Sequence, residues 1–202
     1  MTTKSNNDMG IFDTMYHCRA MRRLKSDPVP RELLLKLVDA AHQGPSASNA
    51  QNDRWLIITR ADIKQKIADL NRAAIDRFYK PDPDAPPSAF LWQYNNLQSV
   101  PAIIIGGLVL NQKRDNFHSG YAAGGSIWPK VQNLLLAARA LQLGACPTNL
   151  PLMLDRAGAY ETLDVPTNME IACVIPVGYP MGRFGPVTRR PVGEIVSWDQ
   201  FG

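Results

Sequence analysis

The chain has 202 residues, of which 45% are hydrophobic and 20% are charged, and its formal net charge is +4 with a pI near 9.0. These values predict a globular protein with one substantial core, and the sequence contains no apolar run long enough to cross a membrane. Basic and acidic residues alternate along most of the chain, which argues against nucleic-acid binding. The polar start lacks the apolar core of an export signal, so we expect one cytoplasmic domain over 1–202, with residues 1–10 flexible.

The first half of the chain predicts two helices separated by a strand. Apolar residues repeat at helical spacing over 31–42, and Gly44 and Pro45 should end that helix. The β-branched run at 56–59 predicts a short strand, and the charged segment from about 62 to 78 predicts a second helix. Four prolines between residues 80 and 88 predict a loop, so we interpret 62–98 as a lid region.

The second half predicts a buried helix between two strands. Residues 100–110 are apolar without alternation, as in a strand that is covered on both faces. Residues 131–143 predict a helix closed by Gly144, and residues 169–178 predict the last strand. Because helices and strands do not alternate regularly, we expect an α+β layered fold with a central mixed sheet flanked by helices.

Cysteine and histidine residues show no spacing typical of a metal site. The three cysteines (Cys18, Cys146 and Cys173) are odd in number and form no Cys-x-x-Cys pair, so we expect reduced thiols and no metal. The sequence also lacks the glycine-rich dinucleotide fingerprint, the Walker sequence, the zincin motif and the nucleophile elbow.

Two groups of basic residues stand out from the otherwise mixed charge. Arg19, Arg22, Arg23 and Lys25 lie near the start, and Arg183, Arg189 and Arg190 lie near the end. Such clusters are often solvated surface, but guanidinium groups also suit a phosphate, and the two clusters could close on one anion if the termini meet in space.

The segment over 44–51 (Gly-Pro-Ser-Ala-Ser-Asn-Ala-Gln) carries more hydrogen-bonding side chains than a turn requires. An ordinary helix-to-strand loop would explain part of this composition. A ring system with carbonyls and ring nitrogens would use the remaining donors and acceptors.

Four segments in order identify a resemblance to the FMN-dependent nitroreductase family over nearly the whole chain. Residues 19–30 resemble its Arg-Ser-x-Arg phosphate motif, with Ala20 in place of the usual serine. Residues 45–53 resemble its Pro-Ser-x-x-Asn-x-Gln-Pro-Trp segment, with Asn52 and Asp53 where Pro-Trp is usual. Residues 132–144 are similar to its central helix, and residues 177–191 resemble its last strand and phosphate-binding tail.

The resemblance implies a set of cofactor-binding residues. The phosphate and ribityl chain of FMN would be held by Arg19, Ala20, Arg22 and Arg189. The isoalloxazine ring would be lined by Pro45, Ser46 and Asn49, and its other face would lie beside Thr148, Asn149 and Leu150. Cys18 stands where many relatives carry another arginine, and Pro129 is expected to delay or kink the start of the central helix.

The resemblance also implies an activity and an assembly. NAD(P)H would give a hydride to FMN, and a nitroaromatic, quinone or related electron-poor acceptor would then take the electrons by a ping-pong mechanism, with no catalytic side chain. Family members are intertwined homodimers with each flavin at the interface. Reductive dehalogenation, flavin modification and non-catalytic flavin binding remain alternatives.

Aromatic residues in the lid region are candidates for stacking on an aromatic substrate. They are Phe78, Tyr79, Phe90, Trp92 and Tyr94. Packing within the core of the lid helices is an equally good interpretation of the same residues.

Overall fold

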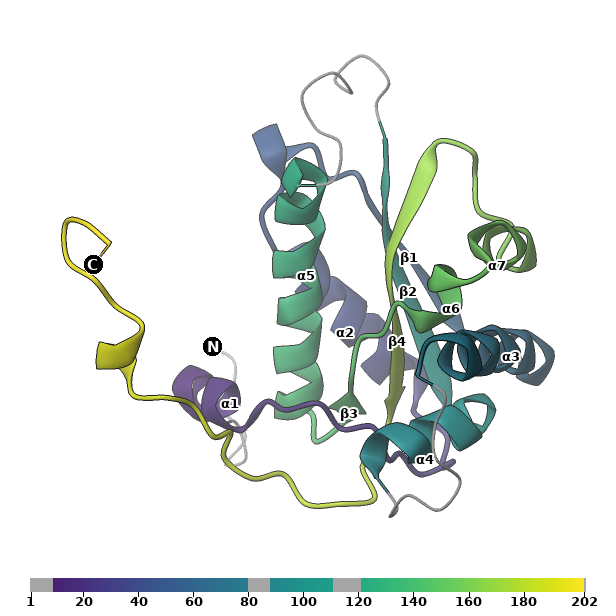
Figure 1. Ribbon diagram of the computed structural model, residues 1–202, viewed down its shortest axis with the longest axis horizontal. Coiled ribbons are helices and arrows are strands. Elements are labelled where there is room, and N and C mark those ends of the chain that lie inside the picture. The colour runs from purple at the N-terminus through teal and green to yellow at the C-terminus, as the bar shows by residue number, and fades with distance from the viewer. Residues whose placement is uncertain (1–8, 80–87, 111–120, 202) are drawn as a thin grey trace.

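The structure, a computed structural model, describes residues 9–79, 88–110 and 121–201. The proline-rich loop and most of the predicted flexible start therefore lie outside the described residues. Within the described part, helices cover both faces of one sheet, so the fold is α+β and layered (Figure 1). No helix in this part of the chain is long and apolar enough to cross a membrane.

The sheet has four described strands in the order β1-β2-β4-β3. They are β1 (Asp53–Ile58), β2 (Ala102–Val109), β3 (Gly144–Ala145) and β4 (Met169–Gly178). Every pairing among them is antiparallel, so the expectation of a mixed sheet is wrong for these strands. The prediction failed because helices bury both faces of β2, and that burial gives an antiparallel strand the continuous apolar sequence usual in parallel sheets.

Side chains alternate along β2 between two cores. Ala102, Ile104 and Leu108 face the core that α2 (Arg31–His42) and α5 (Tyr121–Ala140) cover. Ile103 and Ile105 face the core that contains residues of α3 (Ala61–Phe78). The remaining helices are α1 (Ile11–His17), α4 (Ala89–Asn96), α6 (Leu150–Met153) and α7 (Arg156–Thr162).

The helix predicted over 31–42 is confirmed, and the predicted strand over 169–178 is confirmed as β4. The helix predicted over 131–143 begins ten residues earlier, at Tyr121, and includes Pro129. Proline removes its own backbone donor and its ring crowds the carbonyl one turn earlier, but here the apolar side chains on either side of it, Ile127 and Val131, are buried against the sheet. Burial of this face therefore outweighs the proline, which neither delays nor ends the helix.

After β4 the chain leaves the body as a tail that ends far from the sheet (Figure 1). The tail carries large apolar side chains in water, including Ile195, Trp198 and Phe201, of which Trp198 is 85% exposed. Each such side chain forgoes about 1.5–3 kcal/mol of burial free energy, so the tail has the composition of a segment that packs against another surface.

Two adjacent leucines of α2 test the assignment of its buried face. Leu34 is 3% exposed within the core, whereas Leu35 is 51% exposed. We expect Leu34→Ala to lower the free energy of unfolding by about 2–5 kcal/mol, because it leaves a cavity in a close-packed core. Leu35→Ala should change that free energy by about 0.5 kcal/mol or less in urea titrations, and equal losses would contradict the assigned face.

Candidate functional site

The arginine-rich segment after α1 is extended and lies along the edge of the sheet. The backbone N–H of Met21 donates to the carbonyl of Ala145 at 3.3 Å, and the N–H of Lys25 donates to the carbonyl of Tyr179 at 2.8 Å. The side chain of Leu24 is 1% exposed and joins the core. Gly144 permits this approach, since a Cβ atom there would lie 2.7 Å from a methyl group of Leu24.

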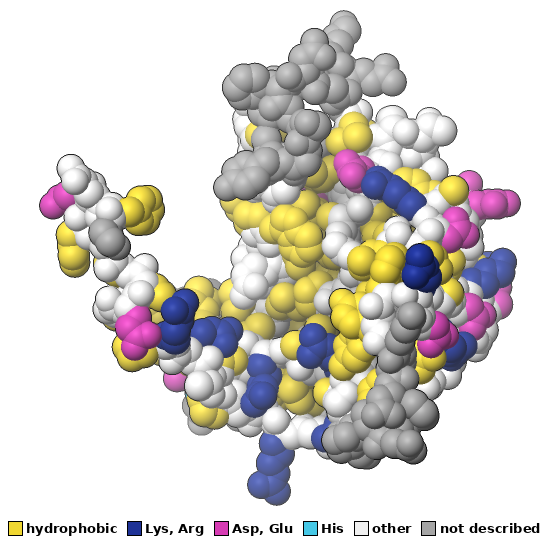
Figure 2. All heavy atoms as spheres, in the orientation of Figure 1, with side chains coloured by type: hydrophobic (Ala, Val, Ile, Leu, Met, Phe, Trp, Pro, Cys, Tyr) yellow, Lys and Arg dark blue, Asp and Glu magenta, His cyan; other side chains and the backbone are white. Residues whose placement is uncertain are grey.

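Beside this segment lies a cavity of about 630 Å³ that is lined by members of both basic clusters. Arg19 and Arg22 from the start of the chain and Arg189 from the tail all line it, as does Ala20. Its other lining residues are Met15, Cys18, Gln132, Leu135, Ala145, Pro147, Val187 and Thr188. None of these lining residues is acidic, so the cavity suits an anion. Figure 2 shows Lys and Arg side chains along the lower part of this face, where the tail leaves the body.

The tail is held beside α1 by a backbone hydrogen bond. The N–H of Val187 donates to the carbonyl of Tyr16 at 3.0 Å, which brings Arg189 toward the segment that carries Arg19. The condition set by the sequence, that the two basic segments meet in space, is met by Arg19, Arg22 and Arg189. Arg23 does not line the cavity.

Arg139, which the sequence analysis missed, lies on α5 near Cys18, a residue that lines this cavity. Its guanidinium carbon lies 4.1 Å from the ring centroid of Phe184, a cation–π contact, and the residue is 8% exposed. Its Nε and Nη1 atoms have no hydrogen-bond partner among the described residues. Burial raises the pKa of the nearby Cys18 thiol, and the positive charge of Arg139 partly offsets that rise.

The predicted ring-binding loop adopts a defined backbone conformation. Ser48, Asn49 and Gln51 all have positive φ angles, and the Ser46 hydroxyl accepts a hydrogen bond from the N–H of Gln51 at 3.1 Å. The N–H of Ala47 donates to the hydroxyl of Ser126, in the first half of α5, at 3.2 Å. Pro45 and Asn49 are exposed at this point, while Ser46 is half-buried.

Within one chain this loop does not reach the arginine cavity. The loop contacts α5 at Ser126, whereas the cavity contacts the same helix at Gln132 and Leu135. Nine residues of helix separate Ser126 from Leu135, which corresponds to about 13 Å along the axis. The predicted ring-binding loop and the predicted phosphate-binding arginines therefore lie at different levels of α5.

The third predicted group, Thr148, Asn149 and Leu150, follows β3 and lies between two cavities. Thr148 exchanges backbone hydrogen bonds with Val174 of β4 at 2.8 and 2.9 Å, and its side-chain oxygen accepts from the N–H of Leu150 at 3.3 Å. The preceding Pro147 lines the arginine cavity, while Asn149 lines a second cavity of about 340 Å³.

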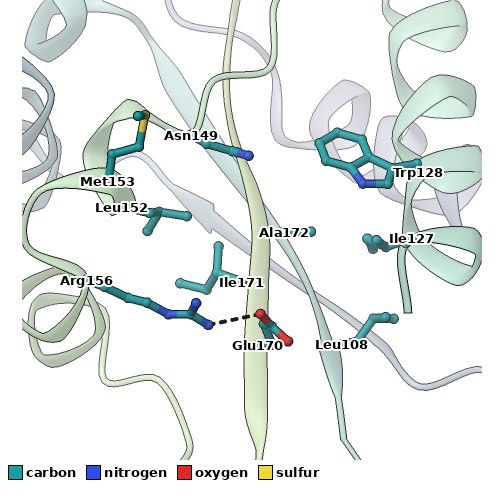
Figure 3. A pocket seen from close by; sticks show the side chains of 11 residues that line it. Leu108, Ile127, Trp128, Asn149, Leu152, Met153, Arg156, Glu170, Ile171 and Ala172 are labelled. Carbon is teal, nitrogen blue, oxygen red and sulfur yellow. Dashed lines mark hydrogen bonds and ion pairs between the residues drawn. The ribbon is translucent and has the colours of Figure 1, made fainter. Parts of the chain in front are cut away.

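The second cavity lies between α5 and the helices α6 and α7 (Figure 3). Leu108, Ile127, Leu152 and Ile171 give it apolar walls. At one end an ion pair joins Arg156 and Glu170 with an N–O distance of 3.1 Å, and the Trp128 ring and Asn149 lie at the other end. The sequence analysis predicted Asn149 but not the charged pair, since residues 14 positions apart carry no local signal.

The aromatic residues of the predicted lid divide between packing and exposure. Trp92 packs against the core that contains Ile103 and Ile105, which favours the packing interpretation for this residue. Tyr94 donates a hydrogen bond to Asp76, and the rings of Tyr79 and Phe90 lie 5.4 Å apart. Phe78 is exposed.

A family model described as "Nitroreductase family" matches residues 17–179, which include the arginine segment, the loop and the sheet. The chain belongs to the nitroreductase family. The match begins just before Arg19 and ends at Tyr179, next to β4, so it leaves most of the tail outside.

Proteins whose names describe different activities are similar to this chain. An iodotyrosine deiodinase of Thermotoga neapolitana is 26% identical over 191 residues, covering 92% of this chain and 95% of that protein. An NADH dehydrogenase of Thermus thermophilus is 28% identical over 197 residues, which cover 89% of this chain and 91% of that protein. A crystal structure of oxidized iodotyrosine deiodinase bound to FMN and 3-iodo-L-tyrosine has a TM-score of 0.77 at 24% identity, covering 95% of this chain and all of that one, and shares the fold.

Alkylation of Cys18 reports on the arginine cavity. Cys18 is half-buried, whereas Cys146 and Cys173 are buried, and burial raises the pKa of Cys173 to about 12. Because burial raises the pKa of Cys18 too, its iodoacetamide labelling at a given pH should be slower than that of N-acetylcysteine and should accelerate to higher pH. Mass spectrometry should also show protection by FMN, with Cys18→Ser as the control. Labelling as fast as the free thiol and unaffected by FMN would contradict the assigned site.

Proposed function

We propose that the chain is an FMN-dependent oxidoreductase that uses NAD(P)H to reduce nitroaromatic, quinone or related electron-poor acceptors. The observation that carries this proposal is the convergence of Arg19, Arg22 and Arg189 on one cavity whose lining contains no acidic residue. Such a set fits the phosphate group of FMN, because guanidinium forks donate paired hydrogen bonds to phosphate oxygens.

In this proposal the protein binds and orients the flavin. Arg19, Arg22 and Arg189 hold the phosphate, with Ala20 beside the ribityl chain, and the loop with Pro45, Ser46 and Asn49 lines the ring. Thr148, Asn149 and Leu150 lie along its other face. The chemistry that FMN supplies when bound is acceptance of a hydride and its later delivery to an acceptor, so no side chain has to act as a nucleophile.

We further propose an intertwined homodimer in which two copies complete each site. In one chain the loop and the arginine cavity contact different levels of α5, and in the proposed dimer the loop of a second copy would approach the cavity. The exposed apolar tail supplies a surface for that contact.

The mass of the protein in solution tests the proposed dimer. Light scattering should give about twice the chain mass, and flavin loss should accompany dissociation, because a ligand shared by two subunits stabilises the assembled state. A flavin-loaded monomer would contradict this assembly.

Substitution of the cavity arginines tests the phosphate site. We expect Arg19→Ala and Arg189→Ala each to weaken FMN binding by about 1.5–3 kcal/mol, because each removes a charge-assisted hydrogen bond to phosphate. Arg23→Ala is the matched control, since it removes the same charge from outside the cavity lining. Fluorescence titration of the apoprotein gives the three affinities, and unchanged binding in both cavity variants would remove the proposed site.

Separate measurement of the two half-reactions tests the activity. Anaerobic NADH or NADPH should bleach the flavin absorbance of the loaded protein, and a nitroaromatic or quinone should restore it. Failure of both nucleotides to bleach bound flavin would instead support a non-catalytic flavin-binding protein.

Reductive dehalogenation is a second candidate for the same site. The similarity to the iodotyrosine deiodinase of Thermotoga neapolitana over 92% of this chain favours it. Release of iodide from 3-iodotyrosine by dithionite-reduced protein distinguishes it from nitroreduction, and no release under conditions that reduce a nitroaromatic would exclude it.

A further inference from the structure

A buried charged cluster lies where α2 ends and the loop over 45–49 begins. The side chains of Lys130 and Asp53 are each 1% exposed, and their charged atoms lie 3.2 Å apart. The Lys130 ammonium also donates to the backbone carbonyls of His42 at 3.0 Å and Gly44 at 2.8 Å. These three contacts use all three donors of the ammonium group.

Asp53 accepts hydrogen bonds from two further side chains. The Nδ1 atom of His42 lies 2.9 Å from one carboxylate oxygen, and Trp55 Nε1 donates to the same oxygen at 2.8 Å. Burial alone would raise the pKa of Asp53, but the hydrogen bonds from His42, Trp55 and Lys130, with the charge of Lys130, outweigh it and lower the pKa. The carboxyl group of Asp53 is therefore ionised at neutral pH.

The pair lies directly against the backbone that enters the loop. A Cβ atom at Gly44 would lie 2.7 Å from Cγ of Lys130, so the lysine stem occupies the space that any other residue at 44 would need. One helical turn earlier, the Ser126 hydroxyl accepts from the N–H of Ala47. Among the described residues, Ser126 attaches the loop to α5 and Lys130 attaches the backbone that enters the loop, and the attachment at Lys130 carries charge.

We propose that Lys130 and Asp53 are positioning residues for flavin binding: the buried pair fixes the carbonyls of His42 and Gly44 and so places the loop over 45–49 against the flavin ring. This inference rests on the proposed function. Replacing a buried ion pair by apolar residues of similar volume often leaves stability unchanged. An apolar pair, however, offers no donor to the two carbonyls. The role of the pair is therefore separable from its effect on stability.

The double variant Lys130→Met/Asp53→Leu separates positioning from stability, because it leaves no unpaired buried charge. Apoprotein of this variant should still fold and unfold cooperatively, but at a lower temperature than the wild-type apoprotein, because the carbonyls of His42 and Gly44 and the indole N–H of Trp55 lose their partners. Its dissociation constants for FMN and for riboflavin should both rise by about tenfold, because the loop contacts the ring that the two ligands share. Arg19→Ala is the matched comparison, since it should weaken the binding of FMN but not that of riboflavin, which has no phosphate.

Three outcomes would overturn the inference. They are affinities for both flavins within about twofold of wild type in the folded double variant, a loss confined to FMN, and full FMN affinity in the isosteric Asp53→Asn variant. If the double variant does not fold, Asp53→Asn decides the question. This variant should bind both FMN and riboflavin more weakly, while circular dichroism shows a folded chain. Absence of FMN binding by the wild-type protein would instead reject the proposed function itself.

Discussion

The site depends on the packing of an extended segment, residues 18–25, against the edge formed by β3 and β4. Backbone hydrogen bonds to Ala145 and Tyr179 and the burial of Leu24 hold this segment in place. These interactions oppose the mutual repulsion of Arg19, Arg22 and Arg189 around a cavity without an acidic lining residue. An anion bound there would replace repulsion by attraction, so the same arrangement that costs free energy in the unliganded chain favours binding of a phosphate.

Helix α5 contacts both the loop after α2 and the arginine cavity, so it fixes their positions relative to one another. Along its length Ser126 and Lys130 contact the loop after α2, and Gln132 and Leu135 line the arginine cavity. The helix is also part of the core, through buried side chains such as Leu134. Rigid packing of this kind gives a cofactor fixed contacts, which preorganisation of a binding site requires.

Local patterns in the sequence predicted the type and bounds of two elements well. The helix over 31–42 and the strand over 169–178 were predicted with the bounds that the structure has. The beginning of α5 was missed because the prediction gave Pro129 more weight than the apolar residues on both sides of it. The orientation of the strands was missed because burial on both faces hides the alternation typical of antiparallel sheets.

The site was predictable only in part, for a physical reason. The arginine clusters and the 44–51 composition are local signals that drew attention to these segments, but only the folded chain shows that Arg19 and Arg189 line one cavity. The pair of Lys130 with Asp53 and the position of Arg139 over Phe184 join residues 77 and 45 positions apart, so no pattern within a short window indicates them. Both depend on how α5 packs, which only the folded chain determines.

A crystal structure of the protein with FMN is the most direct test of the phosphate site. The account predicts phosphate oxygens within about 3.2 Å of the guanidinium groups of Arg19 and Arg189 of one copy. It also predicts the loop over 45–49 of a second copy against the flavin ring. A flavin whose phosphate lies away from these arginines, or a ring bound entirely within one chain, would contradict it.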